Sequence, residues 1–415
     1  MSIDELKYQP GGDKKNSEYF EEYRLKIYER RISSGLIDLL GNMRGVVVQV
    51  EHGDALAYLC ELYLMGPYRF TVGFTSATHK VYVLTSQPEF PRLIVLEPLS
   101  ADYADELTMF NRLYPLSAPK PNARYIGEIF ATKDLNATRE ILESHNIRFN
   151  YHHETKNPFF TDAHFLFTMP SDHTWNRVGY CQLDIDDHDA QQLGNRFELD
   201  PAHLEQLNQV DAFAKEHRLN PLILGLDHMA TRILSGERED AILEFLTMSN
   251  YYFWGAYNIV EMNSSTNVNR NGHVDDDKCS PAKVFTANNT PSFVNSFENL
   301  PMPTEDFVRN YGRRMHHMAY EVVDGDHRGG EKNVDYVVNT LKEKGVDFLA
   351  HVVGECLDDP NLKQIFSKHS KYSILITEYV ERCHGYEGFF TRSNVAALTA
   401  AAGKDERYEH GQVFD

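Results

Sequence analysis

The chain has 415 residues, of which 42% are hydrophobic and 12% aromatic, so it can bury the cores of two or three domains. Asp and Glu number 61 against 41 Lys and Arg, which gives a formal net charge of −20. Binding to phosphate backbones depends on Lys and Arg, so this balance argues against a nucleic acid partner. No run of about 18 apolar residues is present, and we therefore expect no transmembrane helix and no membrane partner.

The cysteine pattern argues against a disulfide framework and against a zinc ribbon. The spacing is wide and contains no Cys-x-x-Cys pair. The first residues are charged and lack the apolar segment of a secretory signal. We therefore expect a cytoplasmic protein with reduced cysteines, namely Cys60, Cys181, Cys279, Cys356 and Cys383.

The apolar pattern repeats the order strand–helix–strand–strand–strand four times. Alternating apolar residues predict strands, and apolar residues three or four apart predict helices. The predicted strands of this pattern are 45–50, 68–75, 81–85, 92–96, 123–131, 149–152, 164–168, 178–183, 222–231, 251–257, 258–265, 283–287, 314–323 and 371–382. The helices are 54–64, 135–144, 204–216, 237–247, 334–341 and 393–402. We predict an α+β fold of tandem βαβββ modules that close in pairs into two half-barrel domains.

Composition divides the chain into four parts. Residues 1–35 are polar and charged, which indicates an N-terminal arm. Residues 36–190 hold the first two modules, and residues 191–220 are expected to form a linker that carries one helix. Residues 221–415 hold the last two modules, followed by a C-terminal helix that is expected to close the site.

Three predicted strands of the last part carry a polar residue among apolar ones. Glu378 lies in the middle of an aliphatic row, and His228 and His317 also share apolar faces, because side chains alternate along a strand. One such histidine is more often a core residue, but a buried carboxylate normally pairs or binds metal. Two histidines and one carboxylate are the ligand set of non-haem iron(II) oxygenases. His316 is a neighbouring alternative ligand, whose side chain we expect on the opposite face.

This ligand set also indicates a substrate class. Three ligands on one face of an octahedral Fe(2+) leave three positions, two for a chelating 2-oxo acid and one for O2. Two neutral imidazoles and one carboxylate leave the iron with a net positive charge, which favours an anionic keto acid. The first half offers no such set, because Ile126 is expected at the position of His317. We therefore expect the N-terminal domain to bind no metal.

The last part of the chain resembles the 4-hydroxyphenylpyruvate dioxygenase family of the vicinal-oxygen-chelate superfamily. The resemblance covers about residues 221–400 and is specific in several motifs. These motifs are Leu226-Asp-His-Met, His317-Met-Ala, the Ile-Thr-Glu-Tyr-Val-Glu-Arg segment around Glu378, Leu362-Lys-Gln-Ile-Phe-Ser-Lys and Gly388-Phe-Phe-Thr-Arg-Ser-Asn.

The resemblance implies the activity and further site residues. It implies an Fe(2+)-dependent dioxygenase of aromatic amino acid metabolism that oxidatively decarboxylates an aryl 2-oxo acid and hydroxylates the same molecule. Gln364 and Asn289 would orient the substrate or the oxygen ligand. Phe366 and Phe389 would hold an aromatic ring, and Ser264 and Asn394 would complete the substrate pocket.

Two positions depart from the family pattern at the substrate end of the pocket. His316 stands where the family has a glutamine, and Met302 falls near a second glutamine position. A sister enzyme of the hydroxymandelate synthase type therefore stays an alternative. So do a non-redox isomerase or lyase that uses another divalent metal, and a binding protein. The exact substrate, the product and the oligomeric state, including a homo-oligomer, stay open.

Overall fold

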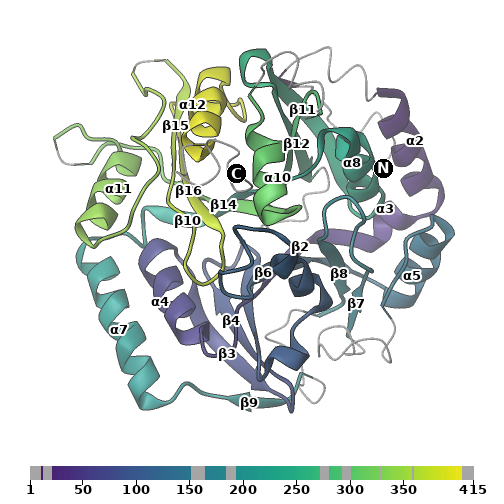
Figure 1. The fold of residues 1–415 in the computed structure, drawn as a ribbon, viewed down its shortest axis with the longest axis horizontal. Coiled ribbons are helices and arrows are strands. Elements are labelled where there is room, and N and C mark those ends of the chain that lie inside the picture. Colours follow the sequence, from purple (N-terminus) through teal and green to yellow (C-terminus); the bar gives the residue numbers. More distant parts are fainter. Residues whose placement is uncertain are drawn as a thin grey trace.

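The computed structural model describes residues 11–12, 21–150, 164–183, 193–271, 280–291, 301–327, 329–357 and 359–403. Four modules follow one another along these residues, as the apolar pattern predicts (Figure 1). The structure confirms the α+β class and the tandem βαβββ modules. No helix among the described residues is long and apolar enough to cross a membrane.

The first two modules form one half of the molecule. The first module consists of β2 (Leu40–Gln49), α4 (Ala55–Met65), β3 (Arg69–Thr75), β4 (His79–Thr85) and β5 (Arg92–Pro98). The second consists of β6 (Arg124–Thr132), α5 (Leu135–Ser144), β7 (Phe165–Phe167) and β8 (Arg177–Cys181). After α5 the described residues show an isolated bridge between Phe149 and Thr168, and residues 151–152 of the strand expected at 149–152 lie outside the described residues.

The last two modules form the other half in the same way. The third module consists of β10 (Ile223–Arg232), α8 (Arg238–Thr247), β11 (Tyr251–Ile259), β12 (Ser264–Asn271) and β13 (Ala282–Asn288). The fourth consists of β14 (Arg314–Val322), α11 (Asn333–Glu343), β15 (Asn361–Phe366) and β16 (Ile376–Cys383). Here the segment after the helix forms two isolated bridges, between Phe348 and Ser367 and between Val353 and Gln364. The helix α12 (Arg392–Gly403) follows the fourth module, as expected.

Each half builds one curled eight-stranded sheet. The first-half sheet has the order β7-β8-β6-β2-β5-β4-β3-β9, with β9 at Asn195–Phe197. The second-half sheet has the order β1-β11-β12-β13-β10-β14-β16-β15, with β1 at Gly11–Gly12. In both sheets the first strands of the two modules pair antiparallel, β2 with β6 and β10 with β14. The first-half sheet lies in the lower part of Figure 1 and the second-half sheet in the upper part.

One hydrophobic core joins the two halves. It contains residues of both sheets, such as Val48 and Tyr320, together with apolar residues of the helices. Within it, Lys283 of β13 lies 2.9 Å from Oε1 of Glu128 of β6, and both side chains are buried. Tyr125 donates to the same carboxylate at 2.6 Å. Apolar packing and the buried pair of Lys283 and Glu128 therefore both help to hold the halves together.

The N-terminal arm packs on the second half of the molecule. The arm contains α2 (Glu21–Ser33), which is followed by α3 (Leu36–Leu39), and β1 extends the second-half sheet by pairing with β11. The buried Arg31 donates to the carbonyl of Tyr251 at 2.9 Å and also to the carbonyl of Leu246. These contacts hold the start of the chain against β11 and α8.

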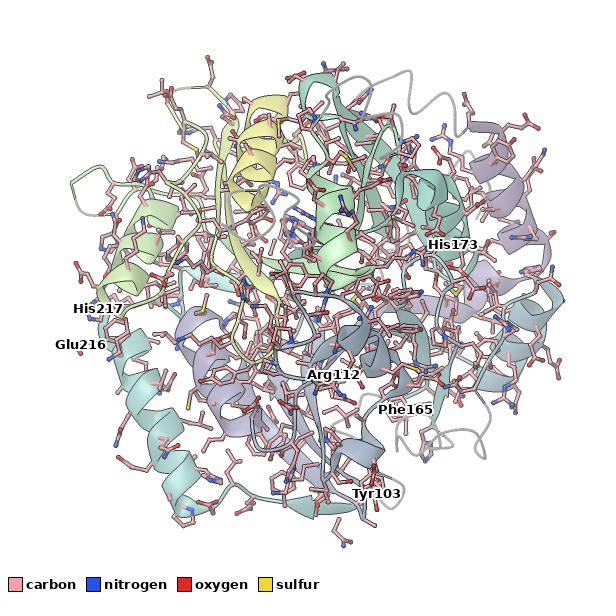
Figure 2. The ribbon with its side chains drawn as sticks, viewed as in Figure 1. Tyr103, Arg112, Phe165, His173, Glu216 and His217 are labelled. Carbon is pink, nitrogen blue, oxygen red and sulfur yellow. A yellow bond between two sulfur atoms is a disulfide. The ribbon has the colours of Figure 1, made fainter. Side chains whose placement is uncertain are left out.

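The linker segment packs on the first half before it reaches the second. In this segment β9 pairs with β3, and the helix α7 (Pro201–Glu216) packs along α4. The helix ends at Glu216, and His217 follows beside the second half (Figure 2). Tyr336 of α11 donates to the carbonyl of His217 at 2.9 Å. The domain bounds 36–190 and 221–415 stay a prediction, because segments outside them contribute to both sheets.

Further segments differ from the sequence-based expectation. The strand expected at 258–265 is interrupted: its residues form the end of β11, a 3-10 helix at Val260–Met262, a left-handed turn at Asn263, whose φ is 47°, and the first two residues of β12. The Glu378 strand begins only at Ile376, because Ile374 has a φ of 63° in the preceding turn. The helix α10 (Pro303–Tyr311) was not expected, since it is short and its apolar residues Phe307, Val308 and Tyr311 cover little more than one turn.

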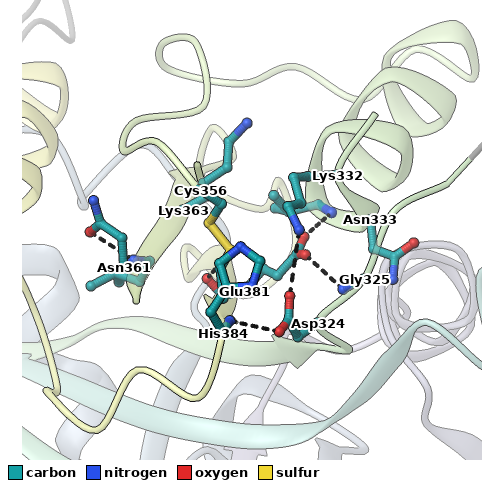
Figure 3. The surroundings of a disulfide bond; sticks show 12 residues. Asp324, Gly325, Lys332, Asn333, Cys356, Asn361, Lys363, Glu381 and His384 are labelled. Carbon is teal, nitrogen blue, oxygen red and sulfur yellow. Dashed lines mark hydrogen bonds and ion pairs between the residues drawn. A yellow bond between two sulfur atoms is a disulfide. The ribbon is translucent and has the colours of Figure 1, made fainter. Parts of the chain in front are cut away.

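The expectation of reduced cysteines is wrong for Cys356 and Cys383. Their sulfur atoms form a disulfide, with the Cα atoms 5.8 Å apart (Figure 3). The disulfide joins the end of β16 to the loop before β15. The two residues are 27 positions apart, a spacing that matches no short motif. The bond therefore depends on the pairing of β15 with β16, which sequence spacing does not reveal.

Candidate metal centre

The three predicted ligands come together on neighbouring strands. His228 lies on β10, His317 on β14 and Glu378 on β16, which are consecutive in the second-half sheet. His228 Nε2 and His317 Nε2 lie 2.9 and 3.2 Å from Glu378 Oε2 and 3.3 Å from each other. All three residues are buried. Two imidazole nitrogens and one carboxylate thus converge on one point on the concave face of the sheet.

Two β-bulges set the direction of these side chains. The β10–β14 register shifts between Leu226 and His228, and Leu226 packs in the core on the other face of the sheet. His228 therefore does not share the face of Leu226, contrary to simple alternation. A second shift leaves His316 as the extra residue on β14, since Ala230 pairs with His317 and Thr231 with Met315.

The second bulge overturns the expected direction of His316. Both His316 and His317 line the same cavity, and their Nδ1 atoms lie 2.8 Å apart. The ring of His316 also contacts the ring of Phe366, with centroids 5.8 Å apart. His317 nevertheless remains the histidine whose Nε2 faces Glu378. His316 therefore supports His317 from the side.

Hydrogen bonds orient the imidazole of His228. Its Nδ1 lies 2.6 Å from Asp227 Oδ1, which leaves Nε2 to face Glu378. Burial alone would lower the pKa of His228, but the carboxylates of Glu378 and Asp227 raise it to about 9. Burial would raise the pKa of Asp227, yet Arg382 and His228 hold it below its usual range.

Burial also shifts the pKa values of the other three groups. Burial, with a smaller effect of His228, lowers the pKa of His317 well below its usual value. Burial lowers the pKa of His316 in the same way, with help from Arg232. Burial also raises the pKa of the Glu378 carboxyl, although His228 opposes this effect. Neutral imidazoles are the form that binds metal.

These residues fit a divalent metal ion. Both carboxylate oxygens of Glu378 are buried; Oε2 lies 2.9 Å from His228 Nε2 and 3.2 Å from His317 Nε2, and Oε1 has no hydrogen-bond partner among the described residues. The ligand atoms of the three residues all lie within 4.8 Å of one another. A buried carboxylate is costly without a positive charge beside it, and a metal ion would supply that charge. The donor set is that of non-haem iron sites.

A second cluster of ligand-type residues does not offer a comparable site. Asp324, Glu381 and Cys383 also lie close together. However, Glu381 accepts hydrogen bonds from the backbone of Gly325 and Val334, and Cys383 is in the disulfide (Figure 3). These contacts close the loop before α11 onto β16.

A cavity lies beside the three ligands, on the concave face of the second-half sheet. Three of the predicted substrate residues line it: Ser264 on β12, and Gln364 and Phe366 on β15. The amide oxygen of Gln364 is buried and has no hydrogen-bond partner among the described residues. The complete lining is Arg232, Ser264, Thr266, Val284, Thr286, Thr304, His316, His317, Gln364, Phe366, Glu378, Phe390, Val395, Leu398 and Thr399.

Three of the predicted substrate residues lie elsewhere. Asn289 donates to Asn258 at 2.7 Å in the turn after β13. Asn394 donates to the carbonyl of Leu362 at 3.0 Å and ties α12 to β15. Phe389 packs beside the ring of His228, with centroids 5.5 Å apart, but lines a second cavity behind the ligand. The next residue, Phe390, lines the cavity in its place.

Several lining residues were not expected from the sequence. Arg232 follows His228 by four positions on β10, so alternation could have placed it on the same face. Thr266 lies two residues after Ser264 on β12, and Thr286 lies two residues after Val284 on β13, so each pair shares a face of the sheet. Thr304 belongs to the unexpected helix α10, and no pattern in the sequence points to it.

The first-half sheet carries glycine at all three ligand positions. The two sheets have equivalent registers: Gly45 pairs with Ile129 as His228 pairs with Ala319, and Phe167 pairs with Gly179 as Phe366 pairs with Glu378. By the same registers, the equivalent of His317 is Gly127, because Gly127 pairs with Val47 as His317 pairs with Ala230.

This register corrects the expectation that Ile126 replaces His317. Ile126 is the bulged residue of β6 and is therefore the equivalent of His316. A Cβ atom at Gly127 would lie 2.1 Å from the carbonyl oxygen of Arg177, and one at Gly179 would lie 2.5 Å from the ring of Phe167. In the first half, neighbouring groups therefore occupy the space that the ligands take in the second.

Comparisons with known proteins support the fold. No family model matches the sequence, and no curated protein matches it. A triple mutant of 4-hydroxymandelate synthase from Streptomyces coelicolor is similar in structure, with a TM-score of 0.59 and 17% identity over 89% of this chain and 99% of that chain. A fusion of a xylose isomerase-like TIM barrel with a 4-hydroxyphenylpyruvate dioxygenase has a TM-score of 0.54 and 12% identity, over 88% of this chain and 53% of that chain. This likeness shows the fold and confirms the two-domain fold implied by the sequence motifs.

Proposed function

We propose that this protein is a non-haem iron(II) dioxygenase that oxidatively decarboxylates and hydroxylates an aryl 2-oxo acid. The observation that carries the proposal is the buried set of His228, His317 and Glu378, which meets beside a cavity. The solved structures with the same fold include a 4-hydroxymandelate synthase and a 4-hydroxyphenylpyruvate dioxygenase fusion, which supports the same class of reaction.

The charges around the cavity favour an anionic substrate. An Fe(2+) ion with two neutral imidazoles and one carboxylate has a net charge of about +1. Arg232 adds a further positive charge to the lining and lowers the pKa values of both His316 and His317 by repulsion. The substrate carboxylate would therefore enter a positively charged site, which is the electrostatic reason to propose a keto acid.

The lining divides into a polar part and an apolar part. Hydroxyl and amide groups come from Ser264, Thr266, Thr286, Thr304 and Gln364, while Phe366 and Phe390 supply aromatic rings. The rings would hold an aryl side chain, and the polar groups would fix the direction of the keto acid. We propose Phe366 and Phe390 for the aromatic contacts, because Phe389 lies outside this lining.

The metal and the protein would have separate tasks. Bound iron would supply the redox chemistry by which O2 is activated and CO2 is released. The chain would hold the iron through its three ligands and would orient the substrate with Gln364 and Ser264. The last helix α12, through Val395 and Leu398, would cover the cavity and exclude water.

The test is oxygen consumption by anaerobically purified protein reconstituted with Fe(2+). The substrates are 4-hydroxyphenylpyruvate, phenylpyruvate and 2-oxoisocaproate, with CO2 release and product structure measured in parallel. We expect uptake of one O2 per CO2 released, with an aryl keto acid as the better substrate and 4-hydroxyphenylpyruvate as the leading candidate. The product would distinguish ring hydroxylation from benzylic hydroxylation.

A matched control separates enzyme-bound iron from free iron. Replacing His52, a histidine of the first half, with Ala should leave the activity unchanged, whereas His317→Ala should remove it. If iron binds but no keto acid supports oxygen uptake, the protein belongs with the non-redox isomerases or lyases. If no divalent metal binds, the proposal of a metal enzyme fails.

A further inference from the structure

We propose that Asp227 and Arg382 are positioning residues that fix His228 in the orientation needed to bind the metal. This inference rests on the proposed metal site, but it concerns side chains that would not touch the metal. Asp227 precedes His228 on β10, and Arg382 follows Glu378 by four residues on β16. The two residues thus connect β10, which carries His228, with β16, which carries Glu378.

Asp227 makes contact with both His228 and Arg382 through its carboxylate. Oδ1 lies 2.6 Å from His228 Nδ1 and accepts from Arg382 Nη2 at 3.0 Å. Oδ2 accepts from Arg382 Nη1. The guanidinium therefore binds the carboxylate through two hydrogen bonds, a geometry that fixes the plane of the carboxylate as well as its charge.

The fixed carboxylate determines which nitrogen of His228 faces the metal. With Nδ1–H donating to Asp227, the lone pair of Nε2 points toward Glu378 and His317. The hydrogen bond also makes the imidazole a stronger donor to a metal ion. Arg382 restrains the carboxylate of Asp227 through both oxygens, because a carboxylate held at one oxygen alone could rotate away from Nδ1 of His228.

The ring of Phe389 contacts both Arg382 and His228. The guanidinium of Arg382 lies 5.1 Å from the centre of the Phe389 ring, and that ring lies 5.5 Å from the imidazole of His228. Arg382 Nη2 also donates to the carbonyl of Phe389 at 3.5 Å. These contacts explain why Phe389 lies beside the ligand although it does not line the cavity next to the metal.

Both proposed residues are accessible from the outer side of the site. Asp227 and Arg382 line a second cavity together with Glu321, Arg270 and Phe389. Water could therefore reach Nδ1 of His228 if the pair were lost. Water would replace a fixed acceptor with a mobile one, and the imidazole could then rotate or change its tautomer. The expected effect is on metal binding first, and on activity as a result.

The experiment measures Co(2+) binding to metal-free protein, without any substrate. Co(2+) reports its ligand field through its visible absorption, so affinity and geometry are read from one titration. We expect Asp227→Asn to bind Co(2+) about 10- to 100-fold more weakly than the wild type, with a changed visible spectrum. Arg382→Gln should act in the same direction, and Arg382→Lys should recover part of the loss because it restores the charge.

Asp211→Asn is the matched control. Asp211 on α7 also pairs with an arginine, since Arg69 Nε donates to Asp211 Oδ1 at 2.6 Å, but this pair does not touch the site. Its loss should leave the affinity for Co(2+) and the spectrum unchanged. Thermal unfolding of each metal-free variant shows whether a change in affinity reflects a damaged fold.

The outcomes separate this inference from the proposed function. Unchanged Co(2+) affinity and spectrum in Asp227→Asn, with normal binding by the wild type, would overturn the positioning role alone. An equal loss in Asp211→Asn would also overturn it, because the effect would then be one of general stability. No binding by the wild type would instead overturn the metal site itself.

Discussion

The concave faces of the two sheets have the same strand register but opposite contents. In the first half this face is filled by apolar side chains such as Phe74, Ile94 and Phe167. In the second half it holds a cavity and three buried candidate ligands, His228, His317 and Glu378. The equivalent first-half positions are Gly45, Gly127 and Gly179. The difference lies in a few side chains, since the pairing of the strands and both bulges are shared.

The comparison shows that one fold can carry either metal-ligand types of side chain or glycines at the same three positions. At Gly179 the ring of Phe167 occupies the place where a side chain would start, and at Gly45 the side chain of Ile94 does the same. At these positions of the first half, neighbouring groups therefore take the space that a ligand side chain would need. Its sheet then serves as a surface against which the second half packs, through the core that both halves share.

The largest expected effect is the loss of metal when a ligand of the second half is removed. Glu378→Ala, His228→Ala or His317→Ala should each reduce bound iron from about one ion per chain to none, because each supplies one of three ligands. His316→Ala should retain the iron, since His317 faces Glu378 without it. Metal analysis of the purified proteins gives the answer. Iron lost in His316→Ala but kept in His317→Ala would reverse the assignment of the ligand on β14.

The next effect concerns the ion pair that joins the halves. Glu128→Ala should destabilise the protein by about 3–5 kcal/mol, because it leaves Lys283 charged and buried without its carboxylate. Replacing both residues with Met should recover much of this loss. Unfolding by urea measures both changes. A single variant as stable as the wild type would show that the halves are held together without this pair.

A smaller effect tests the closed first half. Gly127→Ala should cost about 1–3 kcal/mol, since its Cβ would meet the backbone carbonyl of Arg177 at 2.1 Å. Gly236→Ala is the control, because a Cβ there meets nothing within 4 Å, and its effect should stay within about 0.5 kcal/mol. Both are measured by urea unfolding. Equal stability of the two variants would mean that the first sheet adjusts freely at the equivalent of a ligand position.

The smallest effect concerns the aromatic lining of the second half. Phe390→Ala should lower kcat/KM for an aryl keto acid about two- to tenfold, because aromatic contacts contribute about 0.5–1.5 kcal/mol beyond burial. The loss for 2-oxoisocaproate should be smaller. Steady-state oxygen uptake with both substrates measures the ratio. Equal losses on the two substrates would indicate that Phe390 shapes the cavity without contacting a ring.

The sequence predicted the modules, and it pointed to His228, His317 and Glu378 as candidate ligands, because both leave strong local patterns. Alternation and helical spacing located most of the strands and helices of the four modules, and a carboxylate in an aliphatic row is conspicuous at Glu378. The direction of side chains was less predictable. Each bulge adds one residue to a strand, so alternation placed His316 on the wrong face and pointed to Ile126 where the register gives Gly127.

Contacts between distant segments were also beyond the sequence pattern. Phe389 and Phe390 are adjacent, and only the turn that enters α12 decides which of them faces the cavity. The disulfide depends on how the loop before β15 packs against the end of β16. Asn289 and Asn394 are polar residues near the site in sequence, yet both make hydrogen bonds that stabilise turns and the last helix.

The N-terminal arm has a consequence for the order in which the chain acquires its structure. Arg30 and Arg31 form hydrogen bonds with Thr247 and Tyr251, which are more than 200 residues later in the sequence. During synthesis these arginines leave the ribosome long before their partners exist. The arm must therefore wait without these partners until α8 and β11 have been made, and the apolar residues that the first modules share with the second half wait with it. We expect a fragment that ends at residue 220 to be a poor substitute for the first half, however complete its own sheet.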